Sequence, residues 1–489
     1  MTQWLKPKLR VAVLGAGMSG ILAAIRLQQA GVYEVVVFEK AERIGGTWRD
    51  NHYPGLTCDV PAHAYTFSFA PHAEWSSFLA PGPEIQQYFE GLVRQFQIES
   101  LIRFNQEVSS CIWQNQCWQL QTRSGLQQSF DIVIAATGVL HHLNQPEIKG
   151  LDSFAGDCFH SARWDHSVPL QGRRVGIIGN GSTGVQIVSN LAGKASRVVH
   201  IQRSPQWIMP YPNPPYSDAD RAAFRADPAL IDQIRYSEFY LGLVNRFTEG
   251  VADKDSQQMA EIEAVVLNHL ETSIKDPVLR EKLRPNYRAA CKRLIFSPDY
   301  FEVVQRDDVE VIVGEIDQIK PEGVRMQDGS LLALDVLALA TGFKADRFLR
   351  PMTLLGQDGA DLALSWARRP SAYLGIAMPG FPNFFMLNGP TGPVGNFSLI
   401  DIAERQWGYI DALLAELSSG RAKTLVLKPE VMQDYEARRL QAGKQTIFGS
   451  GCSSWYLDSE GSPSTWPWNY QTFADQTRAP RLEEFERVG

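Results

Sequence analysis

The sequence predicts an α/β protein with two Rossmann-like dinucleotide-binding domains, the second inserted in the first, and a helical insertion beside them. Two glycine-rich motifs are the main evidence: Gly15-Ala-Gly17-Met-Ser-Gly20 and Gly179-Asn-Gly181-Ser-Thr-Gly184. Each motif follows a run of β-branched residues and precedes a helix-forming stretch, as dinucleotide-binding motifs do. A third observation is the repeated strand end Ala-Thr-Gly, at 136–138 and 340–342, which indicates one closing strand for each domain.

The elements of the first domain follow the order that this fold requires. We expect a strand before Gly15, a helix over 21–30, a strand over 35–38 and a closing strand over 131–138. The second glycine motif opens a similar unit that runs from 173 to 203.

A stretch with few glycines and many helix-forming residues predicts the helical insertion, with helices over 257–270 and 276–283. The chain then returns to β structure, with a strand over 309–313, a hairpin over 324–340, and a strand over 384–387 that rejoins the first domain. We therefore expect a discontinuous first domain, a discontinuous second domain and a helical insertion, which comprise 1–145 with 383–489, 150–215 with 295–382, and 216–294, respectively.

Composition narrows the possible partners. The formal charge of −7 over 489 residues gives no support for nucleic-acid binding, which requires clustered Lys and Arg. There is no run of about 18 apolar residues, so we expect no membrane span and a cytoplasmic protein. The six cysteines form no CxxC pair and show no zinc spacing, which argues against a redox-active disulfide and a metal site. We expect them to be small buried residues: Cys58, Cys111, Cys117, Cys158, Cys291 and Cys452.

The residue after the second strand of each unit indicates which dinucleotide is bound. Glu39 lies nineteen residues after Gly20, where an acidic side chain reaches the hydroxyls of an unphosphorylated ribose, so FAD suits the first site. The matching position of the second unit carries Arg203-Ser204, and a cation with a hydroxyl suits a 2′-phosphate. NADPH is therefore favoured over NADH at the second site. The alternative is that Arg203 is a solvated surface charge.

The segment between the two motifs resembles the fingerprint of Baeyer-Villiger monooxygenases. It reads Phe154-Ala-Gly156-Asp-Cys-Phe-His160-Ser-Ala-Arg-Trp164-Asp165 and matches F-x-G-x-x-x-H-x-x-x-W-[P/D] at every fixed position. The resemblance extends from Val11 to about Tyr470 and implies a type I enzyme that contains FAD and consumes NADPH. Such an enzyme converts ketones or aldehydes to esters or lactones with O2. The alternative is a flavin monooxygenase that oxygenates N or S, but related enzymes of that kind commonly have Tyr or Phe in place of Trp164.

The resemblance also implies roles for single residues. Trp48, in Gly-Gly-Thr-Trp, would lie by the isoalloxazine, and Asp59 would lie near the junction of flavin and nicotinamide. Lys292 would reach toward the 2′-phosphate of NADPH. Arg293 would pair with Asp59 and stabilise a C4a-peroxyflavin anion, because a guanidinium stays protonated and donates in a rigid fork. Taken without the resemblance, Arg293 is an ordinary surface or capping arginine.

The candidate site is therefore large. Arg293 and Asp59 are the expected catalytic residues. Residues of the fingerprint are expected to form an interdomain hinge rather than perform chemistry: Phe154, Gly156, His160, Trp164 and Asp165. The expected cofactor-binding residues are Gly15, Gly17, Ser19, Gly20, Glu39, Lys40, Thr47, Trp48, Asp59, Tyr65, Val108, Gly179, Gly181, Ser182, Thr183, Gly184, Gln186, Arg203, Ser204 and Lys292.

Two other interpretations stay open for the C-terminal aromatic residues. Trp455 and Tyr456, followed by Trp466 and Trp468, either line an apolar substrate pocket or belong to the core. A flavin-binding sensor without turnover is disfavoured, because Asp59, Arg293 and the second glycine motif are all present. Neither the natural ketone nor the oligomeric state follows from the sequence.

Overall fold

Two parallel sheets organise the molecule, which is a computed structural model that describes residues 8–393, 397–452, 454 and 456–488. The first sheet has the strand order β19-β7-β1-β2-β3. Its strands are β1 (Leu9–Leu14), β2 (Tyr33–Phe38), β3 (Ile102–Arg103), β7 (Ile132–Ala135) and β19 (Phe384–Met386). All four pairings are parallel, and β19 pairs with β7, so the chain returns to this sheet after a long excursion, as expected.

Helices cover one face of the first sheet, and a smaller sheet described below packs on the other face. Helix α1 (Met18–Ala30) follows the glycine turn and ends at Gly31, whose left-handed φ of 71° closes the helix. It packs against the long helix α12 (Leu399–Ser419), which comes from the C-terminal part of the chain. The other helices near this sheet are α3 (Gly82–Gln95) and α13 (Pro429–Gly443). Because the strands are almost wholly buried, apolar residues run along them without alternation.

The second sheet repeats the plan, with the order β13-β10-β9-β17-β8. Its strands are β8 (Asp157–His160), β9 (Arg174–Ile178), β10 (Arg197–Gln202), β13 (Val309–Val313) and β17 (Val336–Leu339). Helix α4 (Ser182–Leu191) follows the second glycine motif, and the short α10 (Tyr300–Val303) packs on it. The predicted α/β class with two Rossmann-like units is thus confirmed, whereas the residue limits of the domains stay a prediction.

The expected hairpin over 324–340 is only partly right. The strands β15 (Gly323–Met326) and β16 (Leu331–Ala333) do form an antiparallel hairpin, together with β14 (Ile316–Lys320). The last segment, 336–339, instead forms β17, which lies in the second parallel sheet between β9 and β8. All four residues of β17 are buried, which is the pattern of a central parallel strand rather than of a hairpin arm.

A further, mixed sheet packs on the first domain, and two short strand pairs complete the β structure. The mixed sheet has the order β18-β4-β5-β6, in which β18 pairs with β4 in parallel and the other pairings are antiparallel. Trp118 anchors this sheet by donating from Nε1 to the carbonyl of Pro382 at 2.8 Å. The remaining strands are β4 (Val108–Gln114), β5 (Cys117–Thr122), β6 (Gln127–Phe130), β18 (Thr353–Leu355), β11 (Ile208–Pro210) with β12 (Ile295–Ser297), and β20 (Thr424–Leu427) with β21 (Phe485–Val488).

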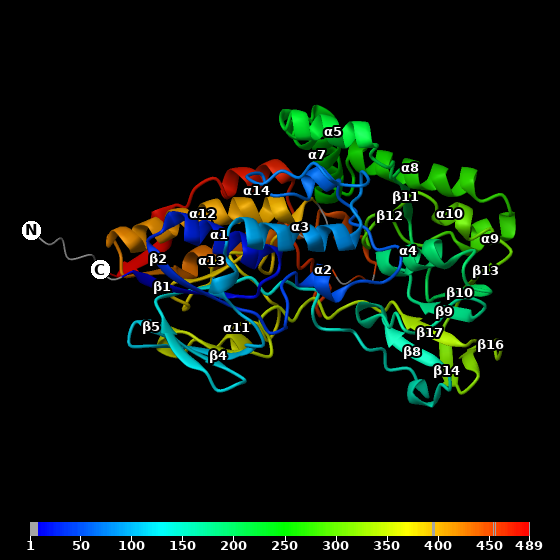
Figure 1. Cartoon of the computed structure of the whole chain (residues 1–489), viewed down its shortest axis with the longest axis horizontal. Helices are drawn as coiled ribbons and strands as arrows, with labels where there is room; N and C mark the ends of the chain where they lie inside the picture. The colour runs from blue at the N-terminus through cyan, green and yellow to red at the C-terminus, as the bar shows by residue number, and fades with distance from the viewer. Residues whose placement is uncertain (1–7, 394–396, 453, 455, 489) are drawn as a thin grey trace, which may run out of the picture.

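The helical insertion caps one edge of the molecule (Figure 1). Its helices are α5 (Asp218–Ala226), α6 (Ala229–Arg235), α7 (Glu238–Ala252), α8 (Gln257–Ser273) and α9 (Pro277–Lys282). The remaining short helices are α2 (Thr47–Asp50), α11 (Leu362–Ser365) and α14 (Tyr470–Gln476). Among the described residues, no helix combines the length and apolar character that crossing a membrane requires.

The expectation that all six cysteines are small buried residues is wrong. Cys291 and Cys452, which are 161 positions apart, form a disulfide. Cys58 and Cys111 are buried free thiols as expected, but Cys117 is half-buried and Cys158 is exposed. No cysteine spacing indicated the disulfide, because its partners meet only through the packing of two distant segments.

Candidate active site

Both glycine motifs open onto one cavity of about 1130 Å³ between the two parallel sheets. Single-ligand pockets commonly have about 300–1,000 Å³, so this cavity is large enough for more than one bound molecule. In each motif the third glycine lets the helix approach the turn. A Cβ at Gly20 would lie 1.8 Å from the Gly15 carbonyl oxygen, and one at Gly184 would lie 2.0 Å from that of Gly179. At Gly181 no atom of the described residues, apart from its own chain neighbours and helix backbone, lies within 4 Å of the corresponding Cβ position, so the backbone there can approach a ligand.

Glu39 stands at the end of β2 and is held in place by several donors. Its carboxylate accepts from the backbone N–H of Ala16 at 2.8 Å and of Ala41 at 2.9 Å, and it pairs with Arg49 at 3.0 Å. Although the residue is only 3% exposed, it lines the cavity. A carboxylate fixed in this way suits the hydroxyls of a ribose. Lys40 and Val108 line the same end, and Lys40 contacts Nδ1 of His141 at 3.3 Å.

The Gly-Gly-Thr-Trp segment forms the start of α2 and brings Trp48 to the cavity wall. Trp48 donates from Nε1 to the Tyr65 hydroxyl at 3.2 Å, and the two rings meet edge to face with centroids 5.5 Å apart. Thr47 accepts from the side-chain amide of Asn51 through its carbonyl, at 2.9 Å. On the opposite side, the hydroxyl of Ser19 accepts from Asn388 at 3.0 Å, which ties α1 to the C-terminal part of the chain.

A cluster of cations lies at the second glycine motif. The Lys292 ammonium donates to the Ser204 hydroxyl at 3.2 Å, and burial together with the charge of Arg203 lowers the pKa of Lys292. Arg203 and Ser182 line the cavity beside them, and the Ser182 hydroxyl is buried without a partner among the described residues. Two cations and two hydroxyls with spare hydrogen-bonding capacity fit the phosphates of a dinucleotide, including a 2′-phosphate.

Arg293 and Asp59 meet where the two halves of the cavity join. Nη2 of Arg293 donates to the Asp59 carboxylate at 2.5 Å, and the two side chains are 30% and 21% exposed. The carboxylate raises the pKa of Arg293, and this effect exceeds the opposing effect of burial. Asp59 also lies near the phenol of Tyr211, whose pKa is raised to about 12, mainly by burial and then by this charge. The pair thus holds a permanent cation in a partly desolvated cavity.

Gln186 makes contacts that the sequence did not indicate. Its side-chain amide donates to the carbonyl and hydroxyl of Thr57, both at 3.1 Å, and its oxygen accepts from the Tyr53 hydroxyl at 2.8 Å. Because Gln186 belongs to α4 and the other two residues precede Asp59, these bonds join the second glycine motif to the first domain. Thr183, on the same helix, lies near the Tyr53 phenol and partly opposes the rise that burial causes in its pKa.

The fingerprint residues support the second domain rather than touch the cavity. Nε2 of His160 contacts the Gly342 carbonyl at 3.1 Å, and its Nδ1 accepts from the Ala162 N–H at 3.1 Å. Trp164 is 5% exposed and packs edge to face on Phe159 at 4.8 Å. Phe154 packs against the core of the second sheet. Gly156 lies so close to the Asp335 carbonyl that a Cβ would not fit there. The Asp165 carboxylate caps a turn by accepting from the Ser167 N–H. None of the five fingerprint residues lines the cavity.

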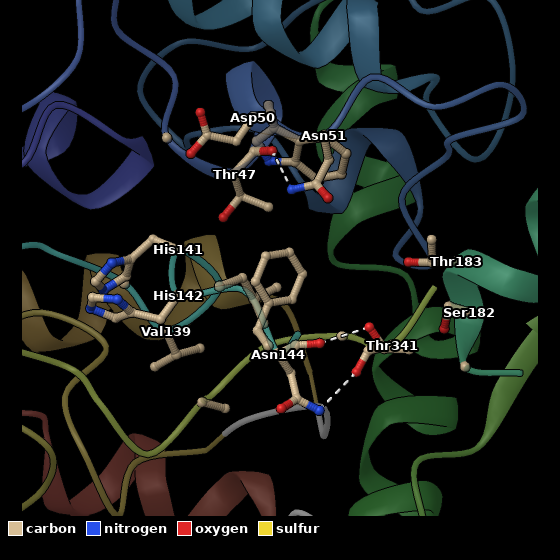
Figure 2. A pocket seen from close by; sticks show the side chains of 18 of the residues that line it. Thr47, Asp50, Asn51, Val139, His141, His142, Asn144, Ser182, Thr183 and Thr341 are labelled. Atoms are coloured by element: carbon tan, nitrogen blue, oxygen red, sulfur yellow. Dashed lines mark hydrogen bonds between the residues drawn. The ribbon is translucent and has the colours of Figure 1, made fainter. Parts of the chain in front are cut away.

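The structure adds cavity residues that sequence reasoning missed. Asn144 follows the first Ala-Thr-Gly strand end, and Thr341 belongs to the second. The two residues are joined by two hydrogen bonds, at 2.7 and 3.2 Å. Figure 2 shows them on the wall with Val139, His141 and His142, opposite Thr47, Asp50 and Asn51. The repeated Ala-Thr-Gly was the available signal, because each copy leads directly into this wall.

The C-terminal aromatics divide between the two interpretations. Trp466 is fully buried in the core of the first domain, with Trp468 packed beside it, and neither lines the cavity. Tyr456 is buried beside Arg293, whose positive charge opposes the rise that burial causes in the pKa of the phenol. Trp455 lies outside the described residues. Among the described residues, no group of His, Cys, Asp or Glu could hold a metal ion.

Comparisons with known proteins agree with this geometry. Residues 8–213 match the family described as flavin-binding monooxygenase-like. An uncharacterized monooxygenase of Mycobacterium tuberculosis is 43% identical over 457 residues, which are 94% of this chain and 92% of that protein. A Baeyer-Villiger monooxygenase of Streptomyces coelicolor is 36% identical over 482 residues, 98% of this chain and 92% of that protein. The crystal structure of OTEMO in complex with FAD and NADP superposes with a TM-score of 0.87 at 26% identity, covering 99% of this chain and 100% of that one.

The fold, the paired glycine motifs and these relatives together define a flavin monooxygenase. The chain belongs to the type I Baeyer-Villiger monooxygenases, enzymes that use FAD and NADPH. The resemblance seen in the fingerprint and the expected cofactors are thereby confirmed.

Proposed function

We propose that the protein converts ketones or aldehydes to esters or lactones, using O2 and NADPH, and that Arg293 is its essential catalytic cation. The observation that carries the proposal is the Arg293–Asp59 pair at the junction of the two dinucleotide sites. FAD is assigned to the site of Gly15, Gly17 and Glu39. NADPH is assigned to the site of the second glycine motif, with its 2′-phosphate at Arg203, Ser204 and Lys292. When bound, the flavin supplies the reductive activation of O2.

The cavity residues would supply binding, orientation and charge. Attack on a carbonyl requires an anionic oxygen nucleophile, and a fixed cation in a partly desolvated cavity stabilises such an anion far better than water does. Arg293 remains protonated because Asp59 raises its pKa. Asp59 in turn fixes the direction of the guanidinium through a charge-assisted hydrogen bond. Trp48 and Tyr65 would form the apolar wall that limits the access of water.

The decisive experiment compares Arg293→Ala with the purified wild-type enzyme. The variant should retain FAD and still oxidise NADPH, because neither glycine motif is touched, but ester formation should fall by at least about a hundredfold, the scale of losing one transition-state donor. Arg288→Ala is the matched control, since that arginine pairs with Glu263 away from the cavity. An Arg293→Ala enzyme that still makes ester at the wild-type rate removes Arg293 from the mechanism.

A further inference from the structure

The Cys291–Cys452 disulfide joins the segment of the catalytic arginine to the C-terminal region. Cys291 precedes Arg293 by two residues and is fully buried. The preceding residue, Ala290, has a left-handed φ of 60°, a conformation that a residue with a side chain adopts only where its surroundings hold it. Cys452 lies four residues before Tyr456, just beyond a 3-10 turn at Ile447–Ser450. The disulfide therefore restricts how far the backbone near Arg293 can move from the backbone near Tyr456.

Both the ring and the backbone carbonyl of Tyr456 are held by neighbouring residues. Its ring is 2% exposed and lies 4.5 Å from the ring of Phe448, centroid to centroid, in a cluster that includes Ala290 and Leu294. Its carbonyl accepts from the backbone N–H of Ser464 at 2.8 Å and from the Ser464 hydroxyl at 3.0 Å. A side chain held this firmly presents its hydroxyl at one place.

The phenol lies beside the guanidinium of Arg293, because Tyr456 belongs to the same buried cluster as Cys291 and Leu294, which flank that arginine. The same guanidinium donates to Asp59. Burial raises the pKa of Tyr456, and the nearby Arg293 opposes that effect, so the phenol is neutral at physiological pH. A neutral acceptor orients the guanidinium without cancelling its charge, which a second carboxylate would do.

We propose that Tyr456 is a positioning residue for Arg293, and that the Cys291–Cys452 disulfide holds it in that position. This inference rests on the proposed catalytic role of Arg293. Without the phenol, the guanidinium is oriented by Asp59 alone and turns toward the carboxylate, so less of its charge faces the reacting oxygen. Electrons from NADPH then reach O2 but are released as hydrogen peroxide in place of ester.

The test is Tyr456→Phe, which removes only the hydroxyl. We expect FAD content and the KM for NADPH to stay within about twofold of wild type, and the ester formed per NADPH oxidised to fall about tenfold, the effect of one hydrogen bond to a charged group. Tyr409→Phe is the matched control, because that buried hydroxyl has no hydrogen-bond partner among the described residues and lies outside the cavity. Equal yields for Tyr456→Phe, Tyr409→Phe and wild type would overturn the proposal.

A second readout separates this inference from the proposed function. Hydrogen peroxide release can be measured without any ketone, in wild type, Arg293→Ala and Tyr456→Phe. If no ketone gives ester but the two variants change peroxide release in the same direction, the proposed function fails and the positioning role stands. If Tyr456→Phe behaves as wild type while Arg293→Ala does not, the positioning role fails.

The disulfide itself is tested by alkylating the denatured enzyme without reductant. Four modified cysteines in the intact mass support the linkage, and six overturn it. This matters because disulfides are rare in reducing compartments. The double variant Cys291→Ser with Cys452→Ser should lose ester yield in the same direction as Tyr456→Phe, and an unchanged yield would show that the disulfide does not hold Tyr456 in place.

Discussion

At the residue scale, the most informative feature is how each charged side chain in the cavity is held by its neighbours. Glu39 is fixed by two backbone N–H groups and Arg49, and Arg293 is fixed by Asp59. Lys292, in contrast, has a lowered pKa because it is partly buried beside another cation. Lys292 and Arg203 lie close together, and two neighbouring cations suit an anionic ligand.

The 2′-phosphate assignment predicts a selective effect of Arg203→Ala. The KM for NADPH should rise about tenfold or more, because a charge-assisted hydrogen bond is lost, while the KM for NADH stays nearly unchanged. Steady-state kinetics with both coenzymes measures this directly. A rise of equal size for the two coenzymes would place the phosphate elsewhere.

The lowered pKa of Lys292 predicts a pH dependence with a definite sign. Only the protonated ammonium attracts phosphate, and a lowered pKa means that the proton leaves at a pH below the ordinary lysine value of 10.5. The KM for NADPH should therefore rise in the alkaline range, and Arg203→Ala should move that rise to higher pH because a repelling charge is gone. NADH, which lacks the phosphate, is the control; the same pH profile for both coenzymes would refute the assignment.

At the scale of elements, the sequence predicted most of what positions the site. The glycine turns, α1, α4 and the strands around them follow from short-range rules, since a β-branched run, a glycine motif and an apolar helix are local signals. The predicted hairpin over 324–340 was partly wrong. The segments β15 and β16 do pair antiparallel, but β17 pairs in parallel with β9, and the sheet that a buried strand joins is decided by tertiary packing rather than by its own sequence. The disulfide could not be predicted at all, because no local signal relates Cys291 to Cys452.

Each helix lies close to its own glycine turn, so we expect a substitution in one glycine motif to disturb the binding of one cofactor and leave the other cofactor bound. Gly184→Ala would place a Cβ 2.0 Å from the Gly179 carbonyl oxygen, so the start of α4 must move and NADPH binding should be lost while FAD is retained. Absorbance of the purified variant and coenzyme titration measure the two properties. Gly408→Ala, within α12 and with open space around it, is the matched control and should stabilise the fold by about 0.5–1 kcal/mol through helix propensity. Unchanged NADPH binding in Gly184→Ala would contradict the account.

At the scale of the whole molecule, specific contacts around the cavity join the two dinucleotide-binding units and attach the C-terminal region to them. Gln186 ties α4 to the segment that carries Asp59, and the Cys291–Cys452 bond ties the arginine segment to the C-terminal region. The expected assignment of Gln186 to cofactor binding alone therefore missed an interdomain contact. The identity of the substrate depends on side chains from several segments brought together by this assembly, which is why sequence patterns indicated the class of reaction but no particular ketone.

Product identification by mass spectrometry distinguishes oxygenation of ketones from oxygenation of N or S. The FAD-loaded enzyme is supplied with NADPH, O2 and a panel of linear, cyclic and aryl ketones together with a thioether. We expect an ester or lactone, one oxygen atom heavier than its ketone, from at least one member of the panel, and none with Arg293→Ala. Sulfoxide as the sole oxygenated product, formed equally well by both enzymes, would contradict this expectation and favour an N- or S-oxygenating monooxygenase.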